Sequence, residues 1–82
     1  MRILRRFVKS GRVAEIQERA ITVFAAVEFI VFVDGSMVKS ELFHGKRLSD
    51  YPAALNALAE RFVDNDWTEQ PVNDPSPPVP PI

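Results

Sequence analysis

The longest apolar run in the chain covers residues 21–33, where one threonine and Glu28 interrupt a series of β-branched, aromatic and alanine side chains. β-branched and aromatic residues pack well on a strand and lose side-chain freedom in a helix. The pair Asp34-Gly35 follows, and it favours a type I′ hairpin turn, which needs positive φ at both central residues. The pattern therefore predicts a central strand at 21–33 that turns back into an edge strand at 37–43.

The segment before this run predicts a second hairpin. Residues 3–8 read as a short strand, and Lys9-Ser10-Gly11 is a turn signal because glycine takes positive φ freely. Residues 12–20 are ambiguous, since their apolar positions fit a strand face while several of them are good helix formers. A strand paired with residues 3–8 is the favoured interpretation, and a short helix opening at Ser10 is the alternative.

The C-terminal half predicts one amphipathic helix and then a tail. Apolar residues recur at spacings of three and four over residues 50–64, with Ser49 or Asp50 as N-cap and Pro52 in the first turn. Trp67 is expected to fold back onto the body of the domain. Residues 71–82 hold six of the seven prolines, which predicts a disordered, solvated tail behind a single domain at 1–70.

These elements define the expected fold class, a small α+β domain. Three to four antiparallel strands, at about residues 3–8, 12–20, 21–33 and 37–43, would pack against the one C-terminal helix at about 50–64. A strand alternates its side chains between two faces. In the central strand one face holds the odd-numbered residues from Ile21 to Val33, and the other holds the even-numbered ones. The helix can cover only one of these faces.

The second face is the most informative feature of the sequence. It carries Phe24, Glu28, Ile30 and Phe32, which are more apolar than the wet face of an antiparallel sheet normally is. We expect these four residues to form an interface with another protein surface, foremost a second copy of the chain. The alternatives are that residues 12–20 form a helix that covers them, or that the sheet curls on itself.

Length and composition strengthen the expectation of self-association. A chain of 82 residues forms one domain with a small core, and it has no cysteine for a disulfide or a thiolate zinc site.

No apolar run near the N-terminus resembles a secretory signal, so we expect a cytoplasmic protein. Residues 21–33 are too short for a membrane helix and carry Glu28 near their middle, so we expect no membrane partner.

Charge is unevenly distributed and suggests a second kind of partner. The net charge is −1, yet residues 1–19 carry six cationic side chains against two carboxylates, and residues 60–82 carry one against five. A basic segment with an interleaved aromatic residue can bind nucleic-acid phosphates. Its candidate contacts are Arg2, Arg5, Arg6, Lys9 and Arg12. The alternative is a solvated edge strand protected by its cations.

Catalytic signals are weak. His44 is the only histidine and has no recognisable nucleophile or orienting acid near it in sequence, which favours a plain loop residue. Glu28 lies in an apolar strand, where a carboxylate is costly unless paired. We expect it to meet an arginine from residues 2–12, on a neighbouring strand or a second subunit, or else to face water beside Ala26. No residue pattern indicates a metal, a cofactor or a catalytic site.

The sequence therefore predicts a small non-enzymatic protein–protein interaction protein, of the adaptor or inhibitor type, that acts as a homodimer through its central strand. The second hypothesis is a nucleic-acid-associated module that uses the basic N-terminal segment. No cofactor is expected for either function. The protein partner cannot be named from the chain, and no known family is recognised in it.

Overall fold

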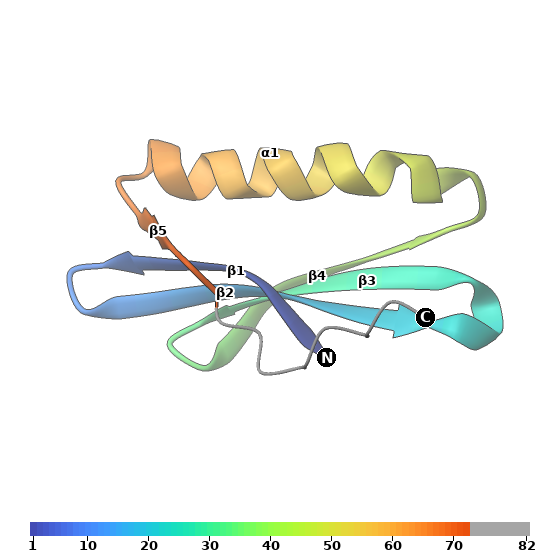
Figure 1. Ribbon diagram of the computed structural model, residues 1–82, viewed down its shortest axis with the longest axis horizontal. Helices are drawn as coiled ribbons and strands as arrows, with labels where there is room; N and C mark the ends of the chain where they lie inside the picture. Colours follow the sequence, from blue (N-terminus) through green and yellow to red (C-terminus); the bar gives the residue numbers. More distant parts are fainter. Residues whose placement is uncertain (73–82) are drawn as a thin grey trace, which may run out of the picture.

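The computed structural model describes residues 1–72 and shows a twisted antiparallel sheet with one helix lying along it (Figure 1). The predicted disordered tail falls largely outside this range. In chain order the elements are β1 (Arg2–Lys9), β2 (Arg12–Ile21), the 3₁₀ helix η1 (Thr22–Phe24), β3 (Ala26–Val33), β4 (Ser36–His44), the 3₁₀ helix η2 (Gly45–Asp50), α1 (Tyr51–Asp64) and β5 (Thr68–Gln70).

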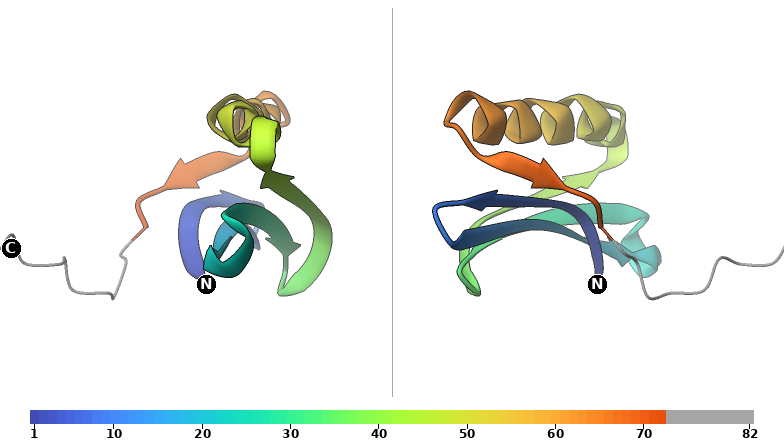
Figure 2. Two further views of the ribbon diagram at one scale, coloured as in Figure 1. Left: turned by 90° about the vertical axis from the view of Figure 1, so that its right-hand side faces the viewer. Right: turned by 60° about the vertical axis from the view of Figure 1, so that its left-hand side comes forward.

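The sheet has five strands in the order β4-β3-β2-β1-β5, and every pair is antiparallel. This confirms the predicted α+β class with one more strand than the expected three to four. The ambiguous segment at residues 12–20 is a strand, paired with β1 on one side and β3 on the other. The added strand, β5, is only three residues long and pairs with β1, so β4 and β5 form the two edges of the sheet (Figure 2).

Both predicted hairpin turns are present. Asp34 and Gly35 have φ values of 51° and 83°, and Ser10 and Gly11 have values of 50° and 78°. Positive φ at both central residues matches the right-handed twist of the flanking strands. The Asp34 carboxylate also accepts hydrogen bonds from the Arg12 guanidinium, at 2.9 Å, and from the backbone N–H of Val13, at 3.1 Å. The two hairpins thus support each other at one end of the sheet.

The predicted continuous strand at residues 21–33 is wrong in its first part. The chain reverses inside the apolar run: β2 ends at Ile21, η1 follows, and β3 begins at Ala26, which pairs directly with Ile21. Ala25 takes the left-handed conformation, with φ 46° and ψ 50°, and so completes the turn. The expected alternation of faces therefore holds only from Ala26 onward, and Val23 and Phe24 project from a turn instead of a strand.

One face of the sheet forms the core with α1. Phe7 is fully buried and stacks on Phe62 of the helix, with 4.8 Å between ring centroids. Phe29 and Phe43 are also buried, and both rings contact Tyr51 at the start of α1. The buried cluster consists of Phe7, Ala14, Ile16, Phe29, Val31, Phe43 and Ala59. The predicted helix thus covers the odd-numbered face of β3, as expected.

Both ends of α1 agree with the sequence in outline. Asp50 is the N-cap, as one of the two expected candidates, although its side chain makes no capping hydrogen bond, and the 3₁₀ helix η2 leads directly into α1. After the helix ends, the Trp67 ring meets Phe62 edge-on at 5.4 Å. This confirms that Trp67 folds back, and the same reversal places β5 beside β1.

Candidate protein-interaction surface

The face of the sheet opposite α1, here called the open face, is covered by no helix formed by residues 1–72 (Figure 2). Residues directly opposite each other on paired strands share a face, so the register identifies its members. Glu28 pairs with Leu42, Ile30 with Ser40, and Phe32 with Met37. Three of the four predicted interface residues, Glu28, Ile30 and Phe32, therefore lie together on the open face.

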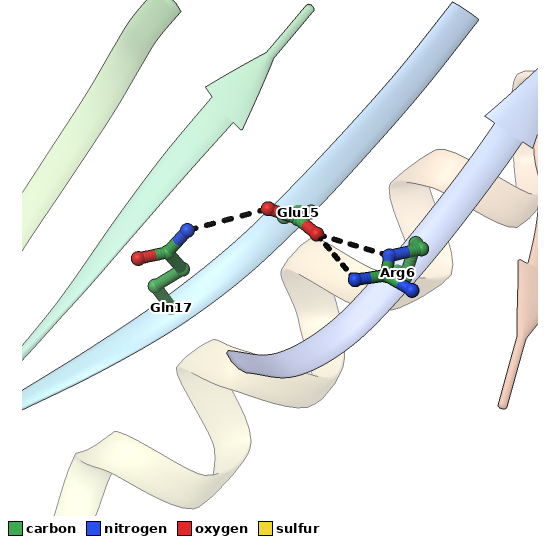
Figure 3. Close-up of polar contacts among 3 residues, drawn as sticks. All are labelled: Arg6, Glu15 and Gln17. Carbon is green, nitrogen blue, oxygen red and sulfur yellow. Dashed lines mark hydrogen bonds and ion pairs between the residues drawn. The ribbon is translucent and has the colours of Figure 1, made fainter. Parts of the chain in front are cut away.

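The centre of the half of the open face formed by β1 and β2 is polar and its charges are paired within the chain, whereas Val8 and Val13 form an apolar cross-strand pair beside it. Arg6 donates two hydrogen bonds to Glu15 Oε2, at 2.9 and 2.8 Å, and Gln17 donates to the other oxygen of Glu15 at 3.3 Å (Figure 3). These residues come from neighbouring strands, because Arg6 is directly opposite Glu15. Both oxygens of the Glu15 carboxylate are therefore satisfied within the chain, and the centre of this half has the polar character of an ordinary wet sheet face.

Glu28 marks the boundary of this half. It pairs with Arg19 on β2 at 2.9 Å, and its own side chain is only 16% exposed. The expectation that it meets an arginine from residues 2–12 on a neighbouring strand is wrong, because β2 lies between β1 and β3 and brings Arg19 directly opposite. Ile30, in the middle of β3, is only 8% exposed although no helix covers it. Neighbouring side chains on the sheet thus partly cover the centre of the open face.

Exposed apolar side chains gather instead on η1 and β4. Five of the nine large exposed apolar residues between positions 1 and 72 lie on these two elements, and we call this set the apolar strip: Val23, Phe24, Met37, Val38 and Leu42. Phe24 is 74% exposed and Met37 is 62% exposed. A concentration of this kind on one part of a small protein is typical of an interaction surface.

The apolar strip has two ends, separated by the polar centre of β4. At one end Phe24 and Leu42 line a shallow pocket of about 210 Å³, together with Ile21, Ala26 and His44. At the other end Met37 and Val38 follow the Asp34-Gly35 turn, where the register shifts between β3 and β4 and Val38 is an extra residue. Such a bulge bends the edge strand and turns its side chains outward.

The five cationic residues proposed for nucleic-acid contact are divided unequally between the two faces of the sheet. Arg2, Arg5 and Lys9 of β1 and Arg12 of β2 lie on the side of α1, whereas Arg6 lies on the open face. Each of the five has a partner in the chain. Arg2 pairs with Glu18, Arg5 with Glu69, Arg6 with Glu15 and Arg12 with Asp34, while Lys9 donates to the Asn65 carbonyl at 2.6 Å. A cationic side chain binds a nucleic-acid phosphate when it can release its counterion, and the contacts with these intrachain partners compete with phosphate for the same side chains.

Among residues 1–72, Asp34 and Tyr51 have clearly shifted pKa values, and neither lies on the apolar strip. The hydrogen bond from Arg12, together with that from the Val13 backbone, lowers the pKa of the exposed Asp34 carboxyl. Burial raises the pKa of Tyr51, and so does the hydrogen bond that its hydroxyl donates to Glu18 Oε2 at 2.6 Å. Both shifts have structural causes, since one group stabilises a turn and the other links the helix to β2.

His44 lies at the end of β4, where it is exposed and borders the pocket beside Phe24. No group of three potential metal-ligating side chains occurs within residues 1–72. The helices in that range are also too short or too polar to cross a membrane. The chemistry that the described surface offers is therefore chiefly apolar contact, with charged groups beside it.

The sequence pattern predicts the open face but identifies only some of the exposed apolar residues. The predicted set is Phe24, Glu28, Ile30 and Phe32, and it includes none of the exposed apolar residues of β4. Met37, Val38 and Leu42 are apolar residues in a segment that was expected to be an edge strand. That combination was the signal that could have identified them, because an edge strand normally limits its exposed apolar residues.

No family model matches the chain, and no significant match was found among curated proteins or solved structures.

Proposed function

We propose that this chain is a small non-enzymatic protein–protein interaction protein, of the adaptor or inhibitor type, that acts as a homodimer through the apolar strip. The observation that carries the proposal is the concentration of exposed apolar side chains on η1 and β4. The charged residues of the β1–β2 half of the open face are paired within the chain, so that half would gain less from contact with a partner than the apolar strip would.

The small size of the domain supports association. A domain of this length buries only about 60% of the surface that its unfolded chain exposes, so additional burial between two copies contributes substantially to stability. Fully burying a leucine or phenylalanine side chain is worth about 1.5–3 kcal/mol. Phe24 and Met37 leave most of that contribution unused in the single chain, since both are more than half exposed.

Sedimentation velocity of the purified protein tests this proposal. We expect the wild type to sediment as a dimer at micromolar concentration. Phe24→Ser and Leu42→Ser should shift it toward the monomer, because each places a hydroxyl where the partner needs apolar contact. Val63→Ser is the matched control, since Val63 is equally apolar and 53% exposed but lies on α1. A wild-type monomer, or equal effects of all three substitutions, would contradict the proposal.

A further inference from the structure

The outer edge of β4 offers a way to position the second copy. β4 is a nine-residue edge strand, whereas the opposite edge, β5, has three residues. An edge strand presents backbone N–H and C=O groups that can pair with another strand. Proteins commonly protect long edges with charges or bulges, and β4 has a bulge only at its first third, beside Val38. Residues from Lys39 to His44 keep a regular register.

The charges of β4 are arranged symmetrically about Ser40. Lys39 is opposite Val31 and Glu41 is opposite Phe29, so both charged side chains leave β4 on the side of the sheet where α1 lies. In an antiparallel pair of two β4 strands related by a two-fold axis through Ser40, Lys39 of each copy is directly opposite Glu41 of the other. Opposite charges in such cross-strand positions stabilise the pair.

The two neighbouring registers of the same pairing are unfavourable. A two-fold axis through Lys39 puts two lysines opposite each other, and an axis through Glu41 puts two glutamates opposite each other. Like charges in directly opposite positions destabilise a sheet. Within residues 1–72, Lys39 forms no ion pair, and Glu41 has only a long contact of 3.4 Å with Arg47. Both groups can therefore accept a closer partner from a second copy.

The two ends of the apolar strip also match under this symmetry. Because the strands run in opposite directions, the Met37–Val38 end of one copy lies beside the Leu42 end of the other. That end holds the shallow pocket lined by Phe24, Ala26 and Leu42. Apolar side chains thus meet apolar side chains on both sides of the central ion pairs. A specific interface needs about 1,000 Å² of buried surface, to which a backbone ladder and these two apolar ends both contribute.

We infer that the second copy binds edge to edge along β4, antiparallel and centred on Ser40, so that two five-stranded sheets become one continuous sheet with both helices on the same side. This inference rests on the proposed function, because it specifies how the homodimer forms. It names the ion pair between Lys39 and Glu41 of the second copy, formed twice by symmetry, as the feature that fixes the register.

Charge reversal tests the inference directly. Lys39→Glu leaves two acidic residues on each β4 edge, and Glu41→Lys leaves two basic ones, so each variant repels its own copy. By symmetry two ion pairs change at once, and we expect each variant to dimerise at least about tenfold more weakly. An equimolar mixture of the two variants should regain the dimer as a heterodimer, because acidic and basic edges then meet. The double variant Lys39→Glu/Glu41→Lys should also dimerise.

Lys46→Glu and Glu60→Lys are the matched controls, since both are exposed residues outside β4 and carry the same charge changes. Recovery in the mixture separates a lost interface from a lost fold, because a misfolded variant would not associate with its counterpart. A wild-type dimer whose single reversals dimerise normally would overturn the edge-to-edge inference while leaving the homodimer intact. Single variants that remain monomeric when mixed would also overturn it. A wild-type monomer would overturn both proposals.

Discussion

Phe7 and Phe24 carry the same side chain in opposite surroundings, and replacing each by alanine should separate the residues that hold the fold from those that contact a partner. Phe7 is fully buried and stacks on Phe62. Truncating a buried phenylalanine costs about 3–5 kcal/mol, which includes the cavity left behind. A domain of this length has a total stability of roughly 4–12 kcal/mol. Phe7→Ala should therefore remove a large share of the stability or unfold the domain.

Phe24 is 74% exposed, so only about a quarter of its side chain is removed from water in the single chain. At about 1.5–3 kcal/mol for a fully buried side chain, Phe24→Ala should cost the monomer on the order of 0.5 kcal/mol. Its effect should appear instead in self-association, which we expect to weaken markedly. Phe7→Ala should therefore have much the larger effect on the stability of the monomer, whereas Phe24→Ala should weaken self-association while the domain stays folded.

Urea unfolding followed by tryptophan emission provides the stability measurement. Trp67 is the only tryptophan, and it lies edge-on against Phe62, so it reports on the core beside Phe7. The experiment should be run at a concentration low enough for the wild type to be monomeric, because dimer formation would add to the apparent stability. If Phe24→Ala lowers the free energy of unfolding as much as Phe7→Ala does, or more, the assignment of Phe7 to the core and of Phe24 to the interaction surface is refuted.

Three further variants test other parts of the account. Burial and the hydrogen bond to Glu18 favour the neutral form of Tyr51 in the folded state and raise its pKa. The resulting stabilisation is complete below about pH 10 and is lost as the pH rises through the folded-state pKa. The stability of the wild type in urea should therefore fall more steeply above pH 10 than that of Tyr51→Phe. An identical dependence of stability on pH above pH 10 would show that ionisation of the buried Tyr51 hydroxyl does not limit stability there. Ala25→Gly should raise the thermal midpoint, with a gain of up to about 1 kcal/mol, because alanine is strained at φ 46°. The double variant Arg5→Ala/Arg6→Ala should lower stability by roughly 1–2 kcal/mol in total, because two ion pairs are lost. Its retention of DNA or RNA at low salt should equal that of the wild type. A loss of retention in the double variant would instead support the nucleic-acid hypothesis.

Most of the fold could be predicted because local and tertiary signals agree. The two glycine-containing turns and the three- and four-residue spacing of the helix each specify one conformation. β3 alternates as predicted from Ala26 to Val33, with the odd residues under α1. β5 could not be predicted, since residues 68–70 are polar and their pairing with β1 depends on Trp67 returning to the core.

The turn at residues 22–25 was missed for a clear physical reason. Thr22, Val23, Phe24 and Ala25 include no glycine, proline or asparagine, and three of them favour strands. The reversal is imposed by the antiparallel pairing of β2 and β3, which overrides these local preferences. The partner of Glu28 was misjudged for a related reason. Its identity depends on strand order, and β2 had to be placed next to β3 before Arg19 could be recognised.

The interface residues were partly predictable because alternation along a strand reveals a shared face without showing what covers it. Ile30 and Glu28 lie on the predicted face, yet their neighbours on the sheet cover most of them. Exposure depends on strand order, since an edge strand has one neighbour and β3 has two. The exposed apolar residues therefore collect on β4 and at the η1 turn, where no adjacent strand covers them.

Light scattering on the purified wild-type protein, coupled to size exclusion and repeated from low to high micromolar concentration, tests the central claim most directly. The claim is that a second copy covers the apolar strip. The account predicts a mass of twice the 9.3 kDa chain that falls toward the single-chain value on dilution. A mass of 9.3 kDa at every concentration would contradict it.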